Sequence, residues 1–192
     1  MKKLAIAIAT VAVLGACGGM SMAPASNSMG MNDTVTVGGA PMFPSKDIVD
    51  NAVNSKDHTT LVAAVKAAGL VDTLKSPGPF TVFAPTNAAF TALPTGTVDT
   101  LLKPENKGTL TKVLTYHVVP GRLDAAALSK MVSASGGRAT LKTASGGTLY
   151  ATASGSNVMI TDEKGGVATV TIANVYQSNG VIHVVNKVLL PG

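Results

Sequence analysis

Residues 80–90 read Phe-Thr-Val-Phe-Ala-Pro-Thr-Asn-Ala-Ala-Phe, and they say more about the fold than any other stretch. The first four are aromatic or β-branched, which favours a strand that is at least half buried. Pro85 lacks an N–H and ends this strand, and Thr86 is a suitable N-cap for a short helix. Three of the four Phe residues of the chain lie here and Trp is absent, so we expect Phe83 and Phe90 to be central to the core.

Two further stretches of distinctive sequence follow later in the chain. Residues 115–121 read Thr-Tyr-His-Val-Val-Pro-Gly, and residues 179–185 read Asn-Gly-Val-Ile-His-Val-Val. In this order and at these separations, the three stretches resemble the fasciclin-like domain family, and the resemblance covers residues 45–192. It implies an α+β fold in which several helices pack against a wedge-shaped β-sandwich. It also implies a protein of binding or adhesion rather than an enzyme.

The residue pattern predicts the same order of elements without the resemblance. Apolar residues recur at helical spacing around Ile48, Leu61 and Leu110, all in the first part of the chain. After Met131, glycine turns recur and separate short β-rich runs, which is typical of an antiparallel meander. The runs are residues 139–143, 148–153, 157–161 and 167–173, and a closing strand is expected over residues 181–190. No alternation of strands and helices indicates a doubly wound sheet.

Composition indicates a globular domain and argues against a nucleic-acid partner. Hydrophobic residues make up 46% of the chain and charged residues only 13%, which is not typical of a disordered protein. The formal net charge is +5, and two of the basic residues, Lys2 and Lys3, lie in the first segment. Because the sequence contains no basic run, we expect no nucleic-acid partner.

Residues 1–16 are predicted to be a signal peptide of the lipoprotein type. Lys2 and Lys3 precede an apolar run of 11 residues from Leu4 to Leu14. As a helix this run covers about 16 Å, which is too short for a bilayer core of about 30 Å. The following Leu-Gly-Ala-Cys resembles a bacterial lipobox, which implies lipidation of Cys17 and a membrane anchor. The alternative is an ordinary signal peptide followed by an unrelated cysteine.

Residues 17–44 are predicted to be a flexible tether, and the domain is predicted to occupy residues 45–192. The tether is rich in Gly, Ser, Ala, Asn and Pro and has no periodic apolar pattern. It contains the pairs Met-Ser-Met and Met-Gly-Met, and thioethers are ligands that suit Cu(I). One hypothesis is therefore a weak copper site formed by Met20, Met22, Met29 and Met31. The other is that these residues reflect only the composition of a linker.

The three histidines are candidates for site chemistry. His58 is expected to be exposed at the start of a helix, whereas His117 and His183 are expected in strands among apolar neighbours. Such histidines can bind a metal or act as a base. The commoner arrangement is a buried ring with internal hydrogen bonds, and this is what we expect for the two strand histidines.

Tyr116 and His117 form the predicted partner-binding site, flanked by the aliphatic residues Leu114 and Val118. The resemblance links a Tyr-His motif at this place to integrin binding in animal members of the family. The acidic-aliphatic element that adhesive animal members carry before the last motif is replaced here by Val-Tyr-Gln-Ser at 175–178, so integrin itself is not expected. Side-chain alternation predicts that at least one of the two rings is buried. We expect His117 to be the more buried ring and to be held neutral by hydrogen bonds.

The predicted function follows from these features. Sequence signatures of a nucleotide-binding loop, a zinc protease helix or a nucleophile elbow are absent. We therefore predict a non-enzymatic, exported and lipid-anchored protein that faces the periplasm or the cell surface and needs no cofactor. Its expected partner is an envelope or cell-surface protein or polysaccharide. The alternative is a periplasmic carrier of a small ligand or of copper.

Overall fold

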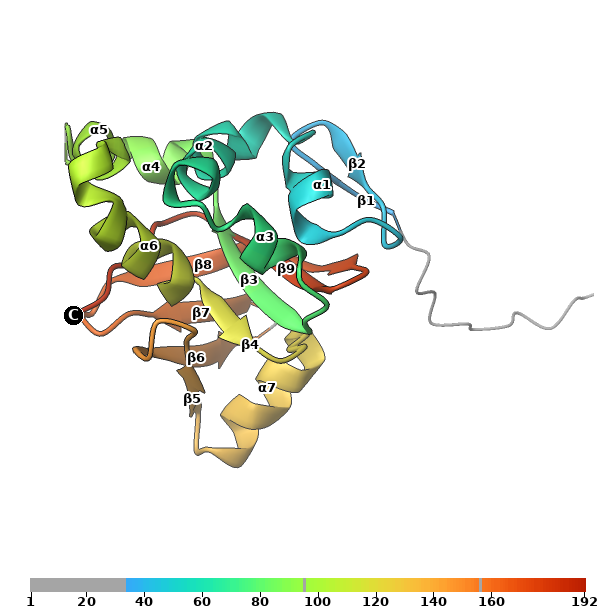
Figure 1. Ribbon diagram of the computed structural model, residues 1–192. Coiled ribbons are helices and arrows are strands. Elements are labelled where there is room, and N and C mark those ends of the chain that lie inside the picture. Colours follow the sequence, from blue (N-terminus) through green and yellow to red (C-terminus); the bar gives the residue numbers. More distant parts are fainter. Residues whose placement is uncertain (1–33, 95, 156) are drawn as a thin grey trace, which may run out of the picture. The chain divides into compact units, whose positions relative to one another are not determined.

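The structure is a computed structural model of the 192-residue chain, and it describes residues 34–94, 96–155 and 157–192 (Figure 1). A hairpin of β1 (Val35–Val37) and β2 (Ala40–Met42) comes first. The helices are α1 (Ile48–Ala52), the 3-10 helix η1 (Lys56–His58), α2 (Thr59–Ala68), α3 (Val71–Lys75), α4 (Asn87–Thr91), α5 (Thr97–Leu102), the 3-10 helix η2 (Pro104–Asn106), α6 (Lys107–Tyr116) and α7 (Ala125–Ala134). The strands of the main sheet are β3 (Phe80–Pro85), β4 (Val118–Pro120), β5 (Arg138–Lys142), β6 (Thr148–Ser154), β7 (Asn157–Thr161), β8 (Val167–Gln177) and β9 (Gly180–Val185).

Strands β3 to β9 form one sheet in the order β4-β3-β9-β8-β7-β6-β5. β9 lies between β3 and β8 and pairs with β3 in parallel, with Phe80 opposite Gly180. The other neighbouring pairs of this sheet are antiparallel. The two ends of the sheet approach each other, since the N–H of Ala144, just after β5, donates to the carbonyl oxygen of Val118 in β4 at 2.7 Å. The sheet is therefore close to a barrel.

The helices cover the sheet in two groups (Figure 1). Helices α1 to α6 gather on the side of β3, β4 and β9, whereas α7 packs against β5 and β6. Helices in the first part and a mostly antiparallel sheet confirm the predicted α+β class. The four predicted meander runs correspond to β5, β6, β7 and β8. The sequence predicted that the closing strand extends to Leu190. In the structure this strand, β9, ends at Val185.

Strand β3 sends its side chains into two apolar cores. Val82 and Ala84 belong to the core between the sheet and the helices, and Phe83 belongs to the core enclosed by the curled sheet and α7. Phe83 is fully buried and Phe90 is 8% exposed. Thr86 caps α4, as predicted, because its hydroxyl oxygen accepts a hydrogen bond from an N–H of the first turn. The predicted central position of this stretch is confirmed.

The predicted end of the tether at residue 44 is corrected by the structure. The first hairpin turns at Gly38 and Gly39, which both have a positive φ, a geometry that glycine adopts without steric cost. Val37 and Met42 are each 2% exposed and belong to the core between the sheet and the helices. The folded domain therefore includes residues 35–44. Strands of three residues beside glycine and proline have the composition of a linker, which explains the error.

Candidate functional site

The predicted partner-binding pair lies at the end of a helix rather than in a strand. Tyr116 is the last residue of α6 and His117 is its C-cap. The apolar residues of α6 keep their helical spacing as far as Leu114, and β4 begins only at Val118. Tyr116 is fully buried and His117 is 3% exposed, so both rings are inside the domain. At least one buried ring was expected and both are buried, and their exposures differ too little to make either ring the more buried.

His117 is a neutral link between α6 and the C-terminal segment. Its Nδ1 lies 2.8 Å from the carbonyl oxygen of Val113, and its Nε2 lies 2.9 Å from the backbone nitrogen of Leu189. A carbonyl oxygen only accepts and a backbone N–H only donates, so Nδ1 carries the proton and Nε2 is the acceptor. Burial lowers the pKa of His117 to about 4, although the hydrogen bond to Val113 opposes this shift. The ring is therefore uncharged at neutral pH.

Tyr116 links α6 to the turns beside β6 and β7. Its hydroxyl donates to the carbonyl oxygen of Thr148 at 2.7 Å and accepts from the backbone N–H of Glu163 at 3.0 Å. Burial raises the pKa of Tyr116 to about 12. Since both rings of the pair are internal, a partner can meet the pair only through the residues that cover it. Its role in partner binding stays a prediction.

The other two histidines are also held inside the domain. His58, which was expected to be exposed, is 2% exposed, and its Nδ1 lies 2.9 Å from Oγ of Ser55. His183 is fully buried in β9, where its Nε2 lies 2.7 Å from the carbonyl oxygen of Leu123 and its ring stacks on Phe83. Burial lowers the pKa of both histidines. Among the described residues, no group of three or more His, Cys, Asp or Glu side chains is arranged to hold a metal ion.

Two asparagines of the sequence motifs also bond to the backbone of neighbouring elements. The side-chain amide of Asn87 bonds to the backbone of η1 and of the first turn of α2. The Oδ1 of Asn179 accepts from the N–H of Ile48 at 3.1 Å, and its Nδ2 donates to the carbonyl oxygen of Leu74 at 2.7 Å. Asn179 therefore fixes the start of α1 and the end of α3 against the sheet. The polar residues of all three motifs thus hold the fold together.

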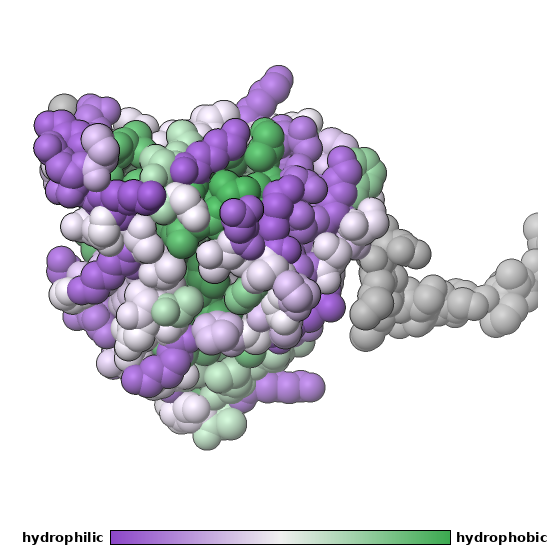
Figure 2. Space-filling view, viewed as in Figure 1, coloured by the Kyte–Doolittle hydropathy of each residue, from purple (hydrophilic) through white to green (hydrophobic). Residues whose placement is uncertain are grey.

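A cavity of about 80 Å³ lies beside the Tyr116–His117 pair, between α2, α3 and α6 and next to β3 and β4. Three of the four residues predicted to contact a partner line it, namely Leu114, His117 and Val118. Because both ring nitrogens of His117 are already hydrogen-bonded, the ring offers no free nitrogen to the cavity. Hydrophobic residues are visible on this face around α2 and α3, with hydrophilic residues at their margin (Figure 2). The aliphatic and aromatic lining includes Val62, Leu70, Val71, Phe80 and Ile182.

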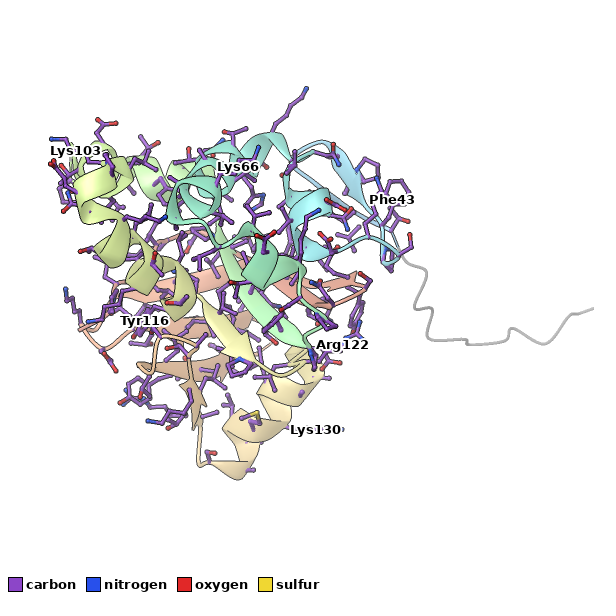
Figure 3. All side chains as sticks on the ribbon, viewed as in Figure 1. Phe43, Lys66, Lys103, Tyr116, Arg122 and Lys130 are labelled. Carbon is purple, nitrogen blue, oxygen red and sulfur yellow. The ribbon has the colours of Figure 1, made fainter. Side chains whose placement is uncertain are left out.

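One lysine lines this cavity, and a second lies beside the end of α2. Lys66, on the exposed side of α2, is one of its lining residues (Figure 3). The Nζ of Lys107 lies 3.5 Å from the point that a Cβ on Gly69 would occupy, directly after the end of α2. Gly69 precedes Leu70, which lines the cavity. Neither lysine forms an ion pair with any residue in the described part of the chain.

Such a cavity can hold a small apolar group. Apolar cavities stay dry and bind apolar molecules, and one of about 150 Å³ holds benzene. The volume found here is about half of that, so it suits a narrow aliphatic group better than a ring. Sequence analysis missed this site because its lining comes from four helices, α1, α2, α3 and α6, that are separate in the sequence. The available signal was the broad apolar face of α2. It includes Val62 beside the buried residues Leu61 and Val65.

Some predicted site residues lie outside the described residues. These are Cys17, with the signal peptide before it, and Met20, Met22, Met29 and Met31. Lipidation and copper binding therefore stay predictions. In the residues that the structure describes, no helix is long and apolar enough to span a bilayer.

The fold and the motifs agree with known proteins. The fasciclin domain matches residues 56–191, and the chain belongs to the fasciclin domain family. It is 42% identical to Protein sll1483 of Synechocystis sp., over 100% of this chain and 99% of that protein. It is 32% identical to the cell surface glycolipoprotein MPB83 of Mycobacterium bovis, over 73% of this chain and 58% of that protein. The family predicted from the three motifs is thus confirmed.

A solved structure confirms the fold. The FAS1 domain pair of the insect cell adhesion molecule fasciclin I superposes with a TM-score of 0.68, over 77% of this chain and 52% of that chain. Its sequence is 18% identical to this chain. At this identity the match establishes the arrangement of helices and strands and nothing further.

Proposed function

We propose that the protein is a non-enzymatic binding protein of the cell envelope, built on a single fasciclin domain. The observation that carries the proposal is that the polar side chains that were candidates for site chemistry are buried in the fold. His58, His117, His183 and Tyr116 are buried and bonded to groups of the fold rather than gathered at a reactive centre. The motif region contributes instead to an apolar cavity, which favours binding over chemistry.

The proposed partner is an envelope or cell-surface protein or polysaccharide. One similarity supports this choice, since a relative that is 32% identical is named a cell surface glycolipoprotein. In this proposal the signal peptide exports the chain, and a lipid on Cys17 keeps the domain beside a membrane.

Capture in the native envelope tests this function. The full chain with a C-terminal tag, cross-linked in cells, is expected to retain at least one envelope component. The matched control carries residues 1–33 on an unrelated globular protein, so that export and anchor are the same and only the fasciclin domain differs. If both proteins retain the same components, or if the full chain retains none, the binding function is contradicted.

The anchor has its own test, the change Cys17→Ser. Cys17 is the only cysteine of the chain, so its loss removes the one thiol that a lipid can occupy. We expect the variant to leave the membrane fraction for the soluble exported fraction, as measured by fractionation and immunoblotting. The control is Ser21→Ala, a small change in the same segment that keeps the thiol. Equal membrane retention of the two variants would show that the anchor is not on Cys17.

A second candidate function is that of a carrier of a small ligand. The apolar cavity is the observation that favours it, because its lining comes from helices and strands that are fixed by internal hydrogen bonds. A cavity of this kind needs little reorganisation to accept a ligand. The copper form of this alternative, through the methionines of the tether, stays a prediction.

A further inference from the structure

We propose that the cavity between α2, α3 and α6 binds the tail of an aliphatic carboxylic acid, and that Lys66 and Lys107 hold its carboxylate. This inference rests on the second candidate function, a carrier of a small ligand, and names the class of ligand. The ligand enters with the tail first, because the bottom of the site is apolar and its border is cationic.

The inner part of the site selects a hydrocarbon chain. Leu114, Val118 and Ile182 close the cavity on the side of α6 and the sheet, and His117 adds a ring without a free nitrogen. A polar ligand group placed there would lose its hydrogen bonds to water without replacing them, which is unfavourable. A volume of about 80 Å³ accepts a few methylene groups at the end of a chain, and the rest of the chain lies toward the opening.

The border of the site selects a negative charge. Lys66 lines the cavity, and the Nζ of Lys107 lies beside Gly69, next to cavity-lining Leu70. Neither lysine is paired with a carboxylate of the described residues, whereas Lys75 on neighbouring α3 already is. A carboxylate ligand would accept charge-assisted hydrogen bonds from the two free ammonium groups. An alcohol of the same chain length would gain much less from them.

Three probes separate the tail from the head group in isothermal titration calorimetry at neutral pH. The protein is the full chain with Cys17→Ser, so that no detergent is needed that could occupy the cavity. Octanoate is expected to bind at one site. 1-Octanol keeps the tail and is expected to bind roughly 3- to 10-fold more weakly, and acetate, which lacks the tail, is expected to show no measurable binding.

Two pairs of variants test the residues. Lys66→Met is expected to weaken octanoate binding roughly 3- to 10-fold and to leave 1-octanol unchanged, and the control Lys130→Met, on α7 (Figure 3), is expected to change neither. Val62→Phe replaces a small aliphatic side chain of the cavity lining by an aromatic ring. It is expected to weaken the binding of both ligands at least about 10-fold. Val167→Phe, at an exposed position of β8, is its control. Thermal melts confirm that each variant is folded.

The proposal is overturned if octanoate fails to bind, if acetate binds as tightly, or if 1-octanol binds as tightly as octanoate. It is also overturned if Lys66→Met behaves as Lys130→Met does, or if Val62→Phe behaves as Val167→Phe does. Failure of octanoate binding leaves the capture of an envelope partner untouched, because that experiment uses no added ligand. The two proposals can therefore fail separately.

Discussion

Replacing Phe83 by Ala is expected to lower the free energy of unfolding by about 3–5 kcal/mol. Phe83 is fully buried in the core between the curled sheet and α7, and its ring stacks on His183 with the centroids 5.7 Å apart. Its backbone N–H also donates to the carbonyl oxygen of His117 at 2.9 Å, so the strand is held at the same point. Truncation leaves a void where the sheet and the end of α6 meet, and the packed surroundings can refill it only in part.

Thermal and urea unfolding of the purified domain measure this loss. For a domain of this size the expected drop in melting temperature is on the order of 10 °C. The matched control is Phe43→Ala, since Phe43 is 41% exposed and its loss should cost less than about 1 kcal/mol. A melting temperature of Phe83→Ala no lower than that of Phe43→Ala would refute the central position of β3 in the core.

His117→Ala is expected to lower the free energy of unfolding by about 2–4 kcal/mol at neutral pH. The change leaves the N–H of Leu189 and the carbonyl oxygen of Val113 without their buried partner, and it enlarges a cavity. The loss is expected to depend on pH, because the folded pKa of about 4 lies below the ordinary value of 6.5.

The sign of this pH dependence follows from the proton count. Between pH 6.5 and 4 the unfolded chain binds a proton at His117 that the folded chain does not bind. The wild-type protein therefore loses about 1.4 kcal/mol per pH unit through this residue, or about 3 kcal/mol in all. The variant lacks this loss, so the stability difference between the two proteins should shrink as the pH falls. A difference that stays constant from pH 7 to pH 4 would contradict the buried, neutral histidine.

Local patterns in the sequence predicted the parts of the fold that short-range chemistry determines. The meander from β5 to β8 could be predicted because glycines mark its turns and apolar residues alternate between them. The cap Thr86 could be predicted because a side-chain oxygen before a helix satisfies a free N–H, and Asp124 caps α7 in the same way. In contrast, the parallel pairing of β3 with β9 joins residues about a hundred positions apart in the chain, and no local pattern contains it.

The candidate site was predicted only in part. Leu114, His117 and Val118 were predicted from a motif, and they do lie together at the cavity. The motif suggested contact with a partner at the surface, whereas a helix ends at Tyr116 and turns both rings inward. The apolar residues after position 117 had indicated a strand around the pair, but the helical spacing before it decides its conformation. Lys66 and Lys107 could not be predicted as a pair, because only the packing of α6 against α2 brings Lys107 beside the end of α2.

The position of β9 has a consequence for the order in which the protein can be made. Residues 180–185 follow all the other strands of the sheet in the chain, yet they fill its middle, between β3 and β8. Until they arrive, β3 has only the three-residue strand β4 beside it, and the meander has no partner on its β8 side. The sheet therefore cannot be completed until residues 180–185 have been synthesised, about a hundred positions after the strand β3 with which they pair.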